Sequence, residues 1–589
     1  MLWRRLKKTM HQEETKNCQN CKKNFVIESE DFNFYEKIKV PAPTWCPECR
    51  AMRRLIWRNE RSLYHNTCAF SGKNLISMFS PETKLVMYDH DIWWSDKWDP
   101  LTYGQDYDFS RPFFEQYKEL LQRVPLMNLG NINCLQGEYG NHNTDCKKFY
   151  LAYACYGSEN ISYSQGTVGV KDSIDLYTVM KSEKCYENVT CTGLYQTHFS
   201  YDSDDSIDSA FLTCCINLQN CLGCINLRHK SYCIFNKQYS KADYENERAK
   251  YDFGSYQALE NFKEKYNDFI KTEPRRFASI LKSTNVTGDN IINSKNSKNI
   301  FDVYGDVEDS KYVAHVMDLK DSYDLYGGGI ASLLYEGVDE GVDAFKQFFG
   351  LLTHSCLETN YTYMCYGSEY LFGCIGLRNQ NHCILNKKYS KEEYEKLMPK
   401  MIEHMNTVPY VDSLGRIYRY GEFFPTDLSP FAYNETIAGE YYTLNKKEAK
   451  GYGFKWKEKE ERDYKIEIKT ENLPDHIKEV DESIIGKIIG CLHKGECEEQ
   501  CTEAFKILDS EFQFYKKNNF ALPRLCPNCR HFQRLKKRNP IKLWHRSCMC
   551  EKQGHFHGQE KCEVQFETSY APDRPEIIYC EKCYQQEVY

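Results

Sequence analysis

Four cysteines near the start of the chain have the spacing of a metal site. Cys18-x2-Cys21 and Cys46-x2-Cys49 form two close pairs, separated by the stretch 22–45. Two such pairs supply four thiolates, which is the tetrahedral ligand set that structural zinc prefers. The alternatives are a pair of disulfides or four buried thiols. We predict a zinc ion held by these four cysteines.

The same pattern recurs near the end of the chain, where Cys501 to Cys548 match Cys21 to Cys68 at a constant offset of 480. Cys497-x3-Cys501 and Cys526-x2-Cys529 are separated by a stretch of the same length, 502–525, which predicts a second zinc site. Between the pairs, each copy predicts a short strand and a short helix, N-capped by Ser29 and by Asp509. The matching landmarks are Phe25/Phe505, Ile27/Ile507, Phe34/Phe514, Tyr35/Tyr515 and Pro43/Pro523.

The repeat continues to His65/His545 and Cys68/Cys548, beyond which the C-terminal copy carries an insertion. Only this copy has enough ligands for a further metal site, because Asp89 and Ile92 stand where it has Cys580 and Cys583. We therefore expect Cys68 and His65 to be structural remnants. The favoured ligands of the third site are Cys550, Cys562, Cys580 and Cys583, with Cys548 as the possible substitute. The alternative is that one or two of these are buried thiols.

Each second cysteine pair runs directly into a basic segment with helical spacing. Arginine grips phosphate with a planar fork, and neighbouring aromatic residues such as Trp45 and Trp57 could stack on bases. The segments therefore indicate contact with nucleic acid; the alternative is solvated helix faces and core aromatics. The candidate contact residues are Arg50, Arg53, Arg54, Arg58, Arg530, Arg534, Lys537 and Arg538.

A Cys pair, a Phe, a Phe-Tyr, a Pro and Cys-x2-Cys-Arg, present in both copies, resemble the family of zinc-binding ribbon domains with a treble-clef-like shape. That resemblance implies zinc and lends no activity. The whole chain resembles a group of bacterial proteins that share Trp93-Trp94-Ser95-Asp96-x-Trp98-Asp99 and the phrase Tyr579 to Tyr584. Some of these carry the label of the CaiB/BaiF CoA-transferases, which use an aspartate nucleophile. The residues of this chain do not support that label.

The middle of the chain contains a second duplication. Gly223-Cys-Ile-Asn-Leu-Arg228 matches Gly373-Cys-Ile-Gly-Leu-Arg378 at an offset of 150, and upstream matches drift by one residue. Short phrases recur at nearly constant spacing, and several cysteines step by nine. Such short periods favour a β-solenoid with alternating strands and inward columns of Cys, Ile, Leu and Tyr. The glycine-rich calcium repeats of RTX rolls are absent, so calcium is disfavoured.

We therefore predict a mainly β fold with some α: two tandem β-solenoid units flanked by N- and C-terminal zinc-ribbon or treble-clef-like modules. Helices are expected over 110–123, 240–250, 256–270 and 390–405, the last opening with the capping box Ser390-x-x-Glu393. The predicted segments are an N-terminal zinc module (1–105), a helical connector (106–133), solenoid unit 1 (134–250), a helical linker (251–284), solenoid unit 2 (285–405), a connector (406–490) and a C-terminal module with the additional metal site (491–589).

Composition limits the class of protein. The chain has 589 residues, 29 cysteines and a formal net charge of −7, which excludes a wholly cationic coat for nucleic acid. No signal peptide and no run of about 18 apolar residues is visible, so we expect no membrane segment. These features predict a cytoplasmic protein whose thiols are reduced, some on metal and the others packed as small apolar groups.

The sequence favours a non-catalytic, zinc-binding multidomain protein that contacts nucleic acid through the basic helices. The alternative is a solenoid scaffold for protein or glycan partners, with purely structural zinc. No nucleotide loop, nucleophile elbow or His-Glu-x-x-His motif is present, so neither an enzyme nor a small-molecule substrate is indicated. The most obvious carboxylate cluster, Asp202, Asp204, Asp205 and Asp208, has the composition of a solvated turn.

Overall fold

The computed structural model describes residues 12–459 and 464–588. They form two compact units, each built from separated parts of the chain. The first unit contains the chain up to Leu129, Ala278–Glu458 and Ile541–Leu543, and the second contains Gly130–Phe277, Lys459–Pro540 and Trp544 onward. Each unit therefore combines one solenoid with the cysteine module from one end of the chain. The N-terminal module belongs with the second solenoid, and the C-terminal module with the first.

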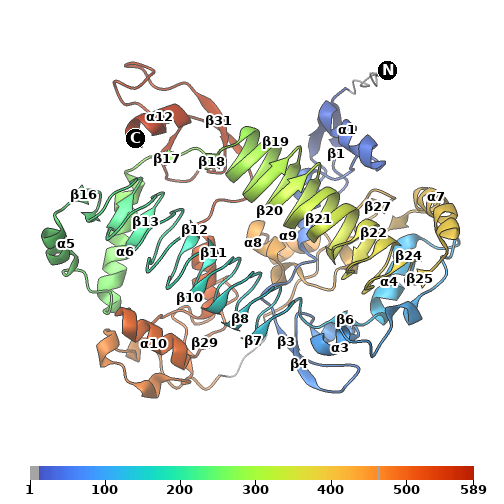
Figure 1. The fold of residues 1–589 in the computed structure, drawn as a ribbon, viewed down its shortest axis with the longest axis horizontal. Helices are drawn as coiled ribbons and strands as arrows, with labels where there is room; N and C mark the ends of the chain where they lie inside the picture. The colour runs from blue at the N-terminus through green and yellow to red at the C-terminus, as the bar shows by residue number, and fades with distance from the viewer. Residues whose placement is uncertain (1–11, 460–463, 589) are drawn as a thin grey trace. The chain divides into compact units, whose positions relative to one another are not determined.

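The first solenoid is a stack of short parallel strands, which Figure 1 shows as successive coils. Neighbouring coils pair in a constant register, as in Phe149↔Ile161 and Ile161↔Ser173. Isolated bridges such as Tyr153↔Gln165 continue the same register between the strands. The strands are β7 (Leu135–Glu138), β8 (Lys147–Tyr150), β9 (Glu159–Ser162), β10 (Lys171–Ile174), β11 (Tyr177–Met180), β12 (Val189–Thr192), β13 (Ala210–Thr213), β14 (Leu222–Ile225), β15 (Cys233–Ile234) and β16 (Lys237–Gln238).

The coil has a period of three residues. Every third residue from Asn133 to Phe235 has a positive φ, which turns the chain, so that four three-residue sides make one coil of 12. The residue after each turn faces the interior: every third residue from Asn143 to Cys224 is buried. The predicted solenoid is confirmed, whereas the predicted alternation of inward and outward residues is replaced by this period. A step of nine places Cys215, Cys224 and Cys233 on different sides of successive coils, so these cysteines form no column.

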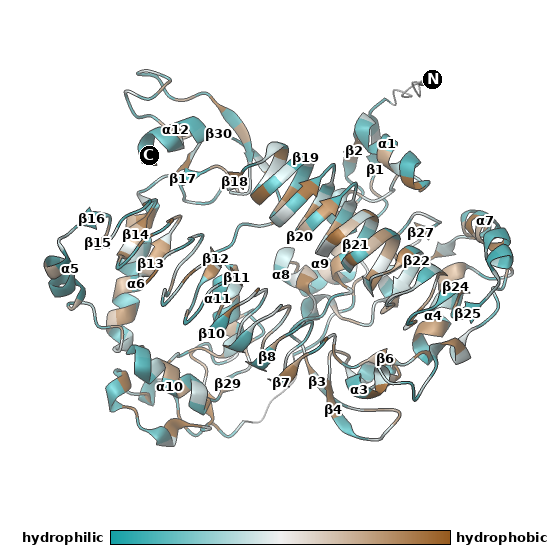
Figure 2. Cartoon of the chain, viewed as in Figure 1, coloured by the Kyte–Doolittle hydropathy of each residue, from teal (hydrophilic) through white to brown (hydrophobic). Residues whose placement is uncertain are grey.

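Many interior positions hold serine, and backbone geometry explains why. The Ser173 hydroxyl donates to the carbonyl of Lys171 at 2.6 Å and accepts from the amide of Cys185, one coil later, at 3.0 Å. Ser182 and Ser206 repeat this pattern with Leu194 and Leu218. Each buried hydroxyl is thereby satisfied, and it links two coils that otherwise share only their strand hydrogen bonds. Figure 2 shows the resulting mixture of hydrophilic and hydrophobic residues along the coils.

The second solenoid repeats this design as one eight-stranded sheet whose strands follow chain order. Lys311↔Tyr323 and Phe345↔Leu357 keep the register of the first solenoid. Two adjacent turn residues, Val342 and Asp343, both with positive φ, account for the one-residue drift between the duplicated halves. The strands are β18 (Ile280–Leu281), β19 (Thr284–Glu308), β20 (Lys311–Lys320), β21 (Tyr323–His354), β22 (Leu357–Tyr363), β23 (Glu369–Phe372), β24 (Asn381–Ile384) and β25 (Lys387–Lys388).

A hairpin and a helix close the last coil of each solenoid. β15 pairs with β16, and β24 with β25, in antiparallel fashion before α5 (Lys241–Arg248) and α7 (Lys391–Thr407) begin. The predicted capping box of Ser390 with Glu393 is present. Two further predicted helices are α4 (Phe113–Arg123), which packs Phe113 on Tyr361, and α6 (Tyr256–Lys271), which packs Phe262 on Phe211. No helix among the described residues is long and apolar enough to cross a membrane.

The two cysteine modules share one order of elements. The N-terminal copy has β1 (Glu14–Asn17), β2 (Asn24–Ile27), α1 (Ser29–Ile38), α2 (Pro47–Leu55), β3 (Tyr64–Thr67), β4 (Asn74–Ser77), β5 (Met87–Tyr88), α3 (His90–Trp93) and β6 (Leu126–Met127). The C-terminal copy has β28 (Ile489–Gly490), β29 (Ala504–Phe505), α10 (Asp509–Asn518), α11 (Pro527–Leu535), β30 (Trp544–Ser547), β31 (Gln565–Thr568), β32 (Ile578–Tyr579, paired with β17, Arg275–Arg276) and α12 (Glu581–Val588). The connector of the first unit adds β26 (Tyr410–Val411), β27 (Ile417–Tyr418), α8 (Ile437–Tyr441) and α9 (Lys446–Gly451).

The helix caps differ by one residue from the prediction. Glu28 and Leu508 are the N-caps, while Ser29 and Asp509 are the first helical residues. The Asp31 carboxylate accepts from the amide of Glu28 at 3.1 Å, and Glu511 accepts from that of Leu508 at 3.3 Å. A carboxylate in the first turn therefore satisfies the cap amide in both copies, whereas the side chains of Ser29 and Asp509 were expected to accept from amides of the first turn.

Glu340 occupies an interior position of the second solenoid. Its side chain is 1% exposed, and neither carboxylate oxygen accepts a hydrogen bond from the described residues. Two glycines make room for it, since a Cβ built on Gly337 or Gly350 would overlap the carboxylate. Burial, with the charge of Asp339, raises the pKa of this carboxyl well above its usual range.

A group whose folded pKa exceeds its unfolded value makes folding less favourable as pH rises above the unfolded value, about 4.3 for Glu. We expect Glu340→Gln, which removes this titration, to raise the melting temperature relative to the wild type at pH 8 and by less at pH 5. The control is Glu358→Gln, an exposed partner of Lys346. Calorimetric scans at both pH values test this, and a pH-independent difference for Glu340→Gln would contradict it.

Candidate metal centres

The first predicted cluster is present. Cys18, Cys21, Cys46 and Cys49 place their sulfur atoms within 4.8 Å of one another. Cys18 follows β1, Cys21 precedes β2, and the other two lie at the start of α2, so a hairpin and a helix N-terminus face each other across the site. The Cys21 and Cys46 sulfurs are 3.7 Å apart, close to the ~3.8 Å edge of a tetrahedron whose ligands lie ~2.3 Å from a central ion.

The C-terminal cluster differs from the prediction in one ligand. The structure brings Cys491, rather than Cys497, together with Cys501, Cys526 and Cys529. The Cys526 amide donates to the Cys491 sulfur at 3.3 Å, as the Cys46 amide does to Cys18 at 3.2 Å. Cys491 is therefore the structural counterpart of Cys18.

An enlarged loop explains the difference. In the N-terminal copy Asn17 pairs with Asn24, whereas in the C-terminal copy Gly490 pairs with Ala504, so the loop between the strands is longer. Cys497 lies in this loop, with its sulfur 3.7 Å from that of Cys529, and could form a second group with His493, Glu499 and Cys529. Matching the two copies without a gap does not reveal this longer loop. The short strand β28, which precedes Cys491 as β1 precedes Cys18, is the feature that identifies Cys491 as the ligand.

The third cluster consists of Cys548, Cys562, Cys580 and Cys583. Cys548, named as the substitute, takes the place expected for Cys550. The Cys580 amide donates to the Cys548 sulfur at 3.1 Å, and α12 starts at this cysteine pair, which repeats the knuckle and helix of the other two clusters. The Cys550 sulfur instead lies 3.2 Å from Nδ1 of His555, in a neighbouring group with His557 and Cys583.

The N-terminal module keeps the frame of this third site. The Asp89 amide donates to the Cys68 sulfur at 3.2 Å, in the place of the Cys580 amide and Cys548. The hairpin of β3 and β4 corresponds to that of β30 and β31. Asp89 and Ile92 stand where the C-terminal copy has cysteines, as the sequence indicated.

The thiols of one cluster compete for a single negative charge. Hydrogen bonds from Cys46 and Cys49 lower the pKa of the Cys18 thiol, while those with Cys18 and Cys46, together with burial, raise the pKa of Cys49. Four thiols this close ionise together only around a cation, because a bound metal deprotonates its thiol ligands. The clusters could therefore hold metal ions.

The arginines of α2 contact the second solenoid rather than solvent. Arg50, Arg53 and Arg54 are at most 3% exposed. Arg50 and Arg54 pair with Asp324 at 2.9 Å and 3.1 Å. Arg53 pairs with Glu336 at 2.8 Å and with Glu422 at 2.6 Å. Arg58, just beyond the helix, pairs with Glu60 and with Asp339.

The C-terminal module docks on the first solenoid in the same way. Arg534 pairs with Asp175 at 2.6 Å, and Arg530 pairs with Asp175 and with Glu511. Both arginines are at most 4% exposed. Arg538 donates to the Tyr177 hydroxyl at 2.6 Å, and Lys537 is exposed. Six of the eight cations predicted to bind nucleic acid are thus unavailable to phosphate, because carboxylates inside the protein already neutralise them.

The solenoid surfaces that these arginines contact are also duplicated. Five turn residues, one coil apart, form a column on each solenoid, and Arg530 lies over the Tyr163 ring as Arg50 lies over Tyr312. The columns are Tyr163, Asp175, Glu187, Phe199 and Phe211 in the first solenoid, and Tyr312, Asp324, Glu336, Phe349 and Tyr361 in the second. The tryptophans predicted to stack on bases are also packed inside the protein: Trp45 is fully buried and Trp57 is 3% exposed.

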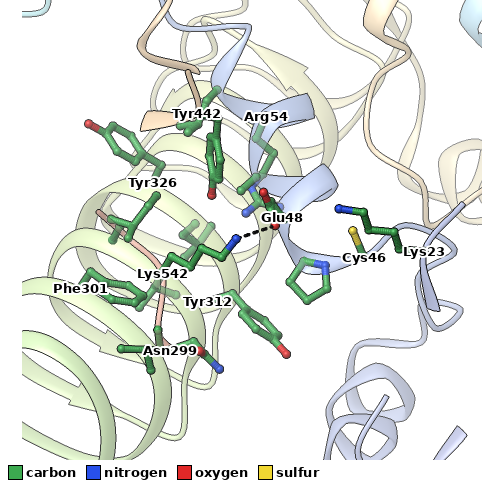
Figure 3. A pocket seen from close by; sticks show the side chains of 18 of the residues that line it. Lys23, Cys46, Glu48, Arg54, Asn299, Phe301, Tyr312, Tyr326, Tyr442 and Lys542 are labelled. Atoms are coloured by element: carbon green, nitrogen blue, oxygen red, sulfur yellow. Dashed lines mark ion pairs between the residues drawn. The ribbon is translucent and has the colours of Figure 1, made fainter. Parts of the chain in front are cut away.

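A recess of ≈ 430 Å³ lies beside the first cluster, within the first unit. Figure 3 shows Cys46 and Lys23 on one side, Tyr312 and Phe301 on the other, and Glu48 paired with Lys542 at 3.5 Å. Lys542 belongs to Ile541–Leu543, so three residues between α11 and β30 complete the first unit.

Neither a protein-family model nor a curated protein matches the chain. The resemblance to zinc-ribbon modules rests on the cysteine clusters, and the CoA-transferase label has no support.

We expect the corrected ligands to show in metal content. Cys491→Ser should lower the metal bound per chain by one equivalent, because it removes a quarter of a closed ligand set, whereas Cys497→Ser should leave the content unchanged. Cys548→Ser and Cys550→Ser form a second matched pair with the same expectation. Elemental analysis of the purified variants measures this. Metal loss confined to Cys497→Ser and Cys550→Ser would contradict the assignment.

The arginine contacts predict a large effect on stability. Arg53→Gln, which installs the residue found at the matching position 533, leaves Glu422 buried without its cation and should cost about 3–5 kcal/mol. The control Lys37→Gln breaks the exposed pair with Asp321 and should cost under about 1 kcal/mol. Chemical denaturation compares them, and equal losses for the two variants would disprove a special role for Arg53.

Proposed function

We propose that the protein is a non-catalytic scaffold in which zinc-bound modules lock two β-solenoids into rigid units, leaving the solenoid faces to bind protein or glycan partners. The observation that supports it best is the complete burial of Arg53 between carboxylates of the solenoid and the connector. The helix that follows the cysteine pair is directed into the fold, and the same holds for Arg534 in the second unit. The modules therefore hold the solenoids through these ion pairs, as ribbon or treble-clef domains with structural metal do.

Zinc is the metal that fits the ligand set. Four thiolates in a closed shell select zinc or iron, and zinc is the usual occupant of a four-cysteine site formed by a knuckle and a helix N-terminus. A closed shell has no open position for substrate, which supports a structural role. The sulfur separations of 3.5 Å for Cys526–Cys529 and 3.9 Å for Cys562–Cys580 agree with a tetrahedron of this size.

The carboxylate cluster considered for catalysis supports the same proposal. Asp202, Asp205 and Asp208 have positive φ and lie three residues apart, so they occupy successive corners of one coil. Their side chains therefore leave the solenoid on different sides and do not converge on one substrate. Burial, reinforced by Asp202, raises the pKa of Asp204 to about 7, but its carboxylate is engaged by the amide of Thr192 at 3.0 Å.

The test is to purify the native chain at low salt and to measure both its metal and its absorbance ratio at 260 and 280 nm. We expect three zinc ions per chain, one for each four-cysteine cluster, and an absorbance ratio of protein alone. Removing zinc with a chelator should expose the α2 and α11 segments to protease while the solenoid coils resist. Nucleic acid that stays bound at low salt and leaves at high salt would overturn the scaffold in favour of nucleic-acid binding.

A further inference from the structure

The second unit contains a recess of ≈ 500 Å³. Its walls come from the corner column of the first solenoid (Glu187, Phe199, Phe211), from α6, and from residues 521–537 around α11. A volume of this size is typical of pockets for small organic molecules. The lining combines aromatic rings, among them Tyr256 and Tyr266, with charged side chains.

The charges in the recess do not balance. Eight lysine and arginine side chains line it, against three glutamates. Five of the cations have carboxylate partners. Arg530 and Arg534 share Asp175, and Arg530 also pairs with Glu511. Arg574 pairs with Glu576, Lys536 with Glu499, and Lys263 with both Glu260 and Glu187. An excess of positive charge remains after these pairs are formed.

Three of the cations, Arg275, Arg524 and Lys537, form no ion pair with the described residues, although Glu576, Asp475 and Glu187 respectively lie close enough to interact with their charges. Arg275 is 4% exposed, and its Nη1 atom has no hydrogen-bond acceptor within the described chain. Arg524 donates only to the carbonyls of Thr470 and Pro474. Lys537 is exposed and forms no ion pair, with Glu187, Lys263 and Arg534 as its charged neighbours. A buried guanidinium without an anion is costly, so the site is built to receive one.

The first unit shows what fills the matching space. There the Glu422 carboxylate accepts from the Thr44 amide at 3.1 Å and from Arg53 at 2.6 Å. At the offset of 480, the counterparts of Thr44 and Arg53 are Arg524 and Gln533, and both line the recess of the second unit. Tyr361, whose hydroxyl donates to the Glu422 carbonyl at 3.2 Å, corresponds to Phe211 in the recess wall.

The segment that carries Glu422 belongs to the connector after the second solenoid. The chain after the first solenoid runs into α5 and α6, and in the second unit Arg524 meets the backbone carbonyls of Thr470 and Pro474 rather than a carboxylate. Where the first unit holds the Glu422 carboxylate, the second unit therefore has an open, cationic recess.

We propose that this recess binds a small organic phosphate, whose phosphate group lies where the first unit holds the Glu422 carboxylate. A phosphate is favoured over a carboxylate because it carries up to two charges and three acceptor oxygens, which suit several converging cations. The aromatic wall would contact the organic part. This ligand adds a binding function to the scaffold, and it does not depend on the scaffold proposal.

The experiment uses the full-length, metal-loaded chain and calorimetric titration with AMP, ribose 5-phosphate and pyrophosphate, with adenosine as the uncharged probe. At least one of the two organic phosphates, AMP or ribose 5-phosphate, should bind, and adenosine should bind at least about tenfold more weakly than AMP. Lys537→Glu should weaken phosphate binding by at least about tenfold, and the melting temperature of the same variant separates loss of the ligand contact from loss of the fold. Lys517→Glu, an exposed lysine on α10 outside the recess, is the matched control and should bind like the wild type.

Absence of binding by both organic phosphates at millimolar concentration would overturn the proposal. So would phosphate binding that Lys537→Glu and Lys517→Glu weaken equally, because binding would then follow overall charge. Binding of the peptide Tyr-Gly-Glu-Phe-Phe, the sequence of residues 420–424, without binding of any phosphate would assign the recess to an acidic peptide instead.

Discussion

Buried arginine–carboxylate pairs determine how this molecule is assembled. A guanidinium removed from water is tolerated only where carboxylates meet it with good geometry. Arg53 meets this condition twice, through Glu336 and Glu422, and Arg534 meets it through Asp175. The pairs with Glu336 and Asp175 join an end module to a solenoid that is remote in sequence, and the pair with Glu422 joins it to the connector. The four-cysteine clusters stand at the first turn of the helices that carry these arginines, so the clusters fix where the guanidinium groups point.

Duplication explains the architecture, and the departures from it indicate function. Both modules use the same helix to contact the same column of turn residues, Tyr, Asp, Glu and Phe. The copies then diverge in complementary ways. The first unit lacks the cysteines matching Cys580 and Cys583, and its connector inserts Glu422. The second keeps a third cluster and leaves the matching surface open and cationic.

The sequence predicts much of this fold, because duplications and cysteine spacing survive without any structural information. Two tandem solenoids, the four-cysteine cluster at Cys18 and the helices at 256–271 and 391–407 were all accessible in this way. The three-residue period was not visible in the sequence, because the spacings that stand out, nine and twelve residues, are both multiples of three. Cys491 was missed because an enlarged loop separates it from Cys501, beyond the usual length of a knuckle.

The role of the arginines could not be predicted, for a physical reason. A basic helix has the same sequence whether its charges meet phosphate or buried carboxylates, and the decisive partners lie 274 to 369 residues away in the chain. The recess was equally hidden, since Arg275, Arg524 and Lys537 come from three separate segments.

Hydrogen exchange, measured by mass spectrometry before and after chelation of the metal, tests the account most directly. If the metal clusters position the arginines that pair with solenoid carboxylates, removing metal should abolish protection of α2 and α11. Protection should also fall at the turns around Asp324 and Asp175. The solenoid strands should stay protected through their own coil-to-coil hydrogen bonds. Unchanged protection of α2 and α11 in chain shown to be free of metal would contradict the central claim that metal-held modules lock the solenoids.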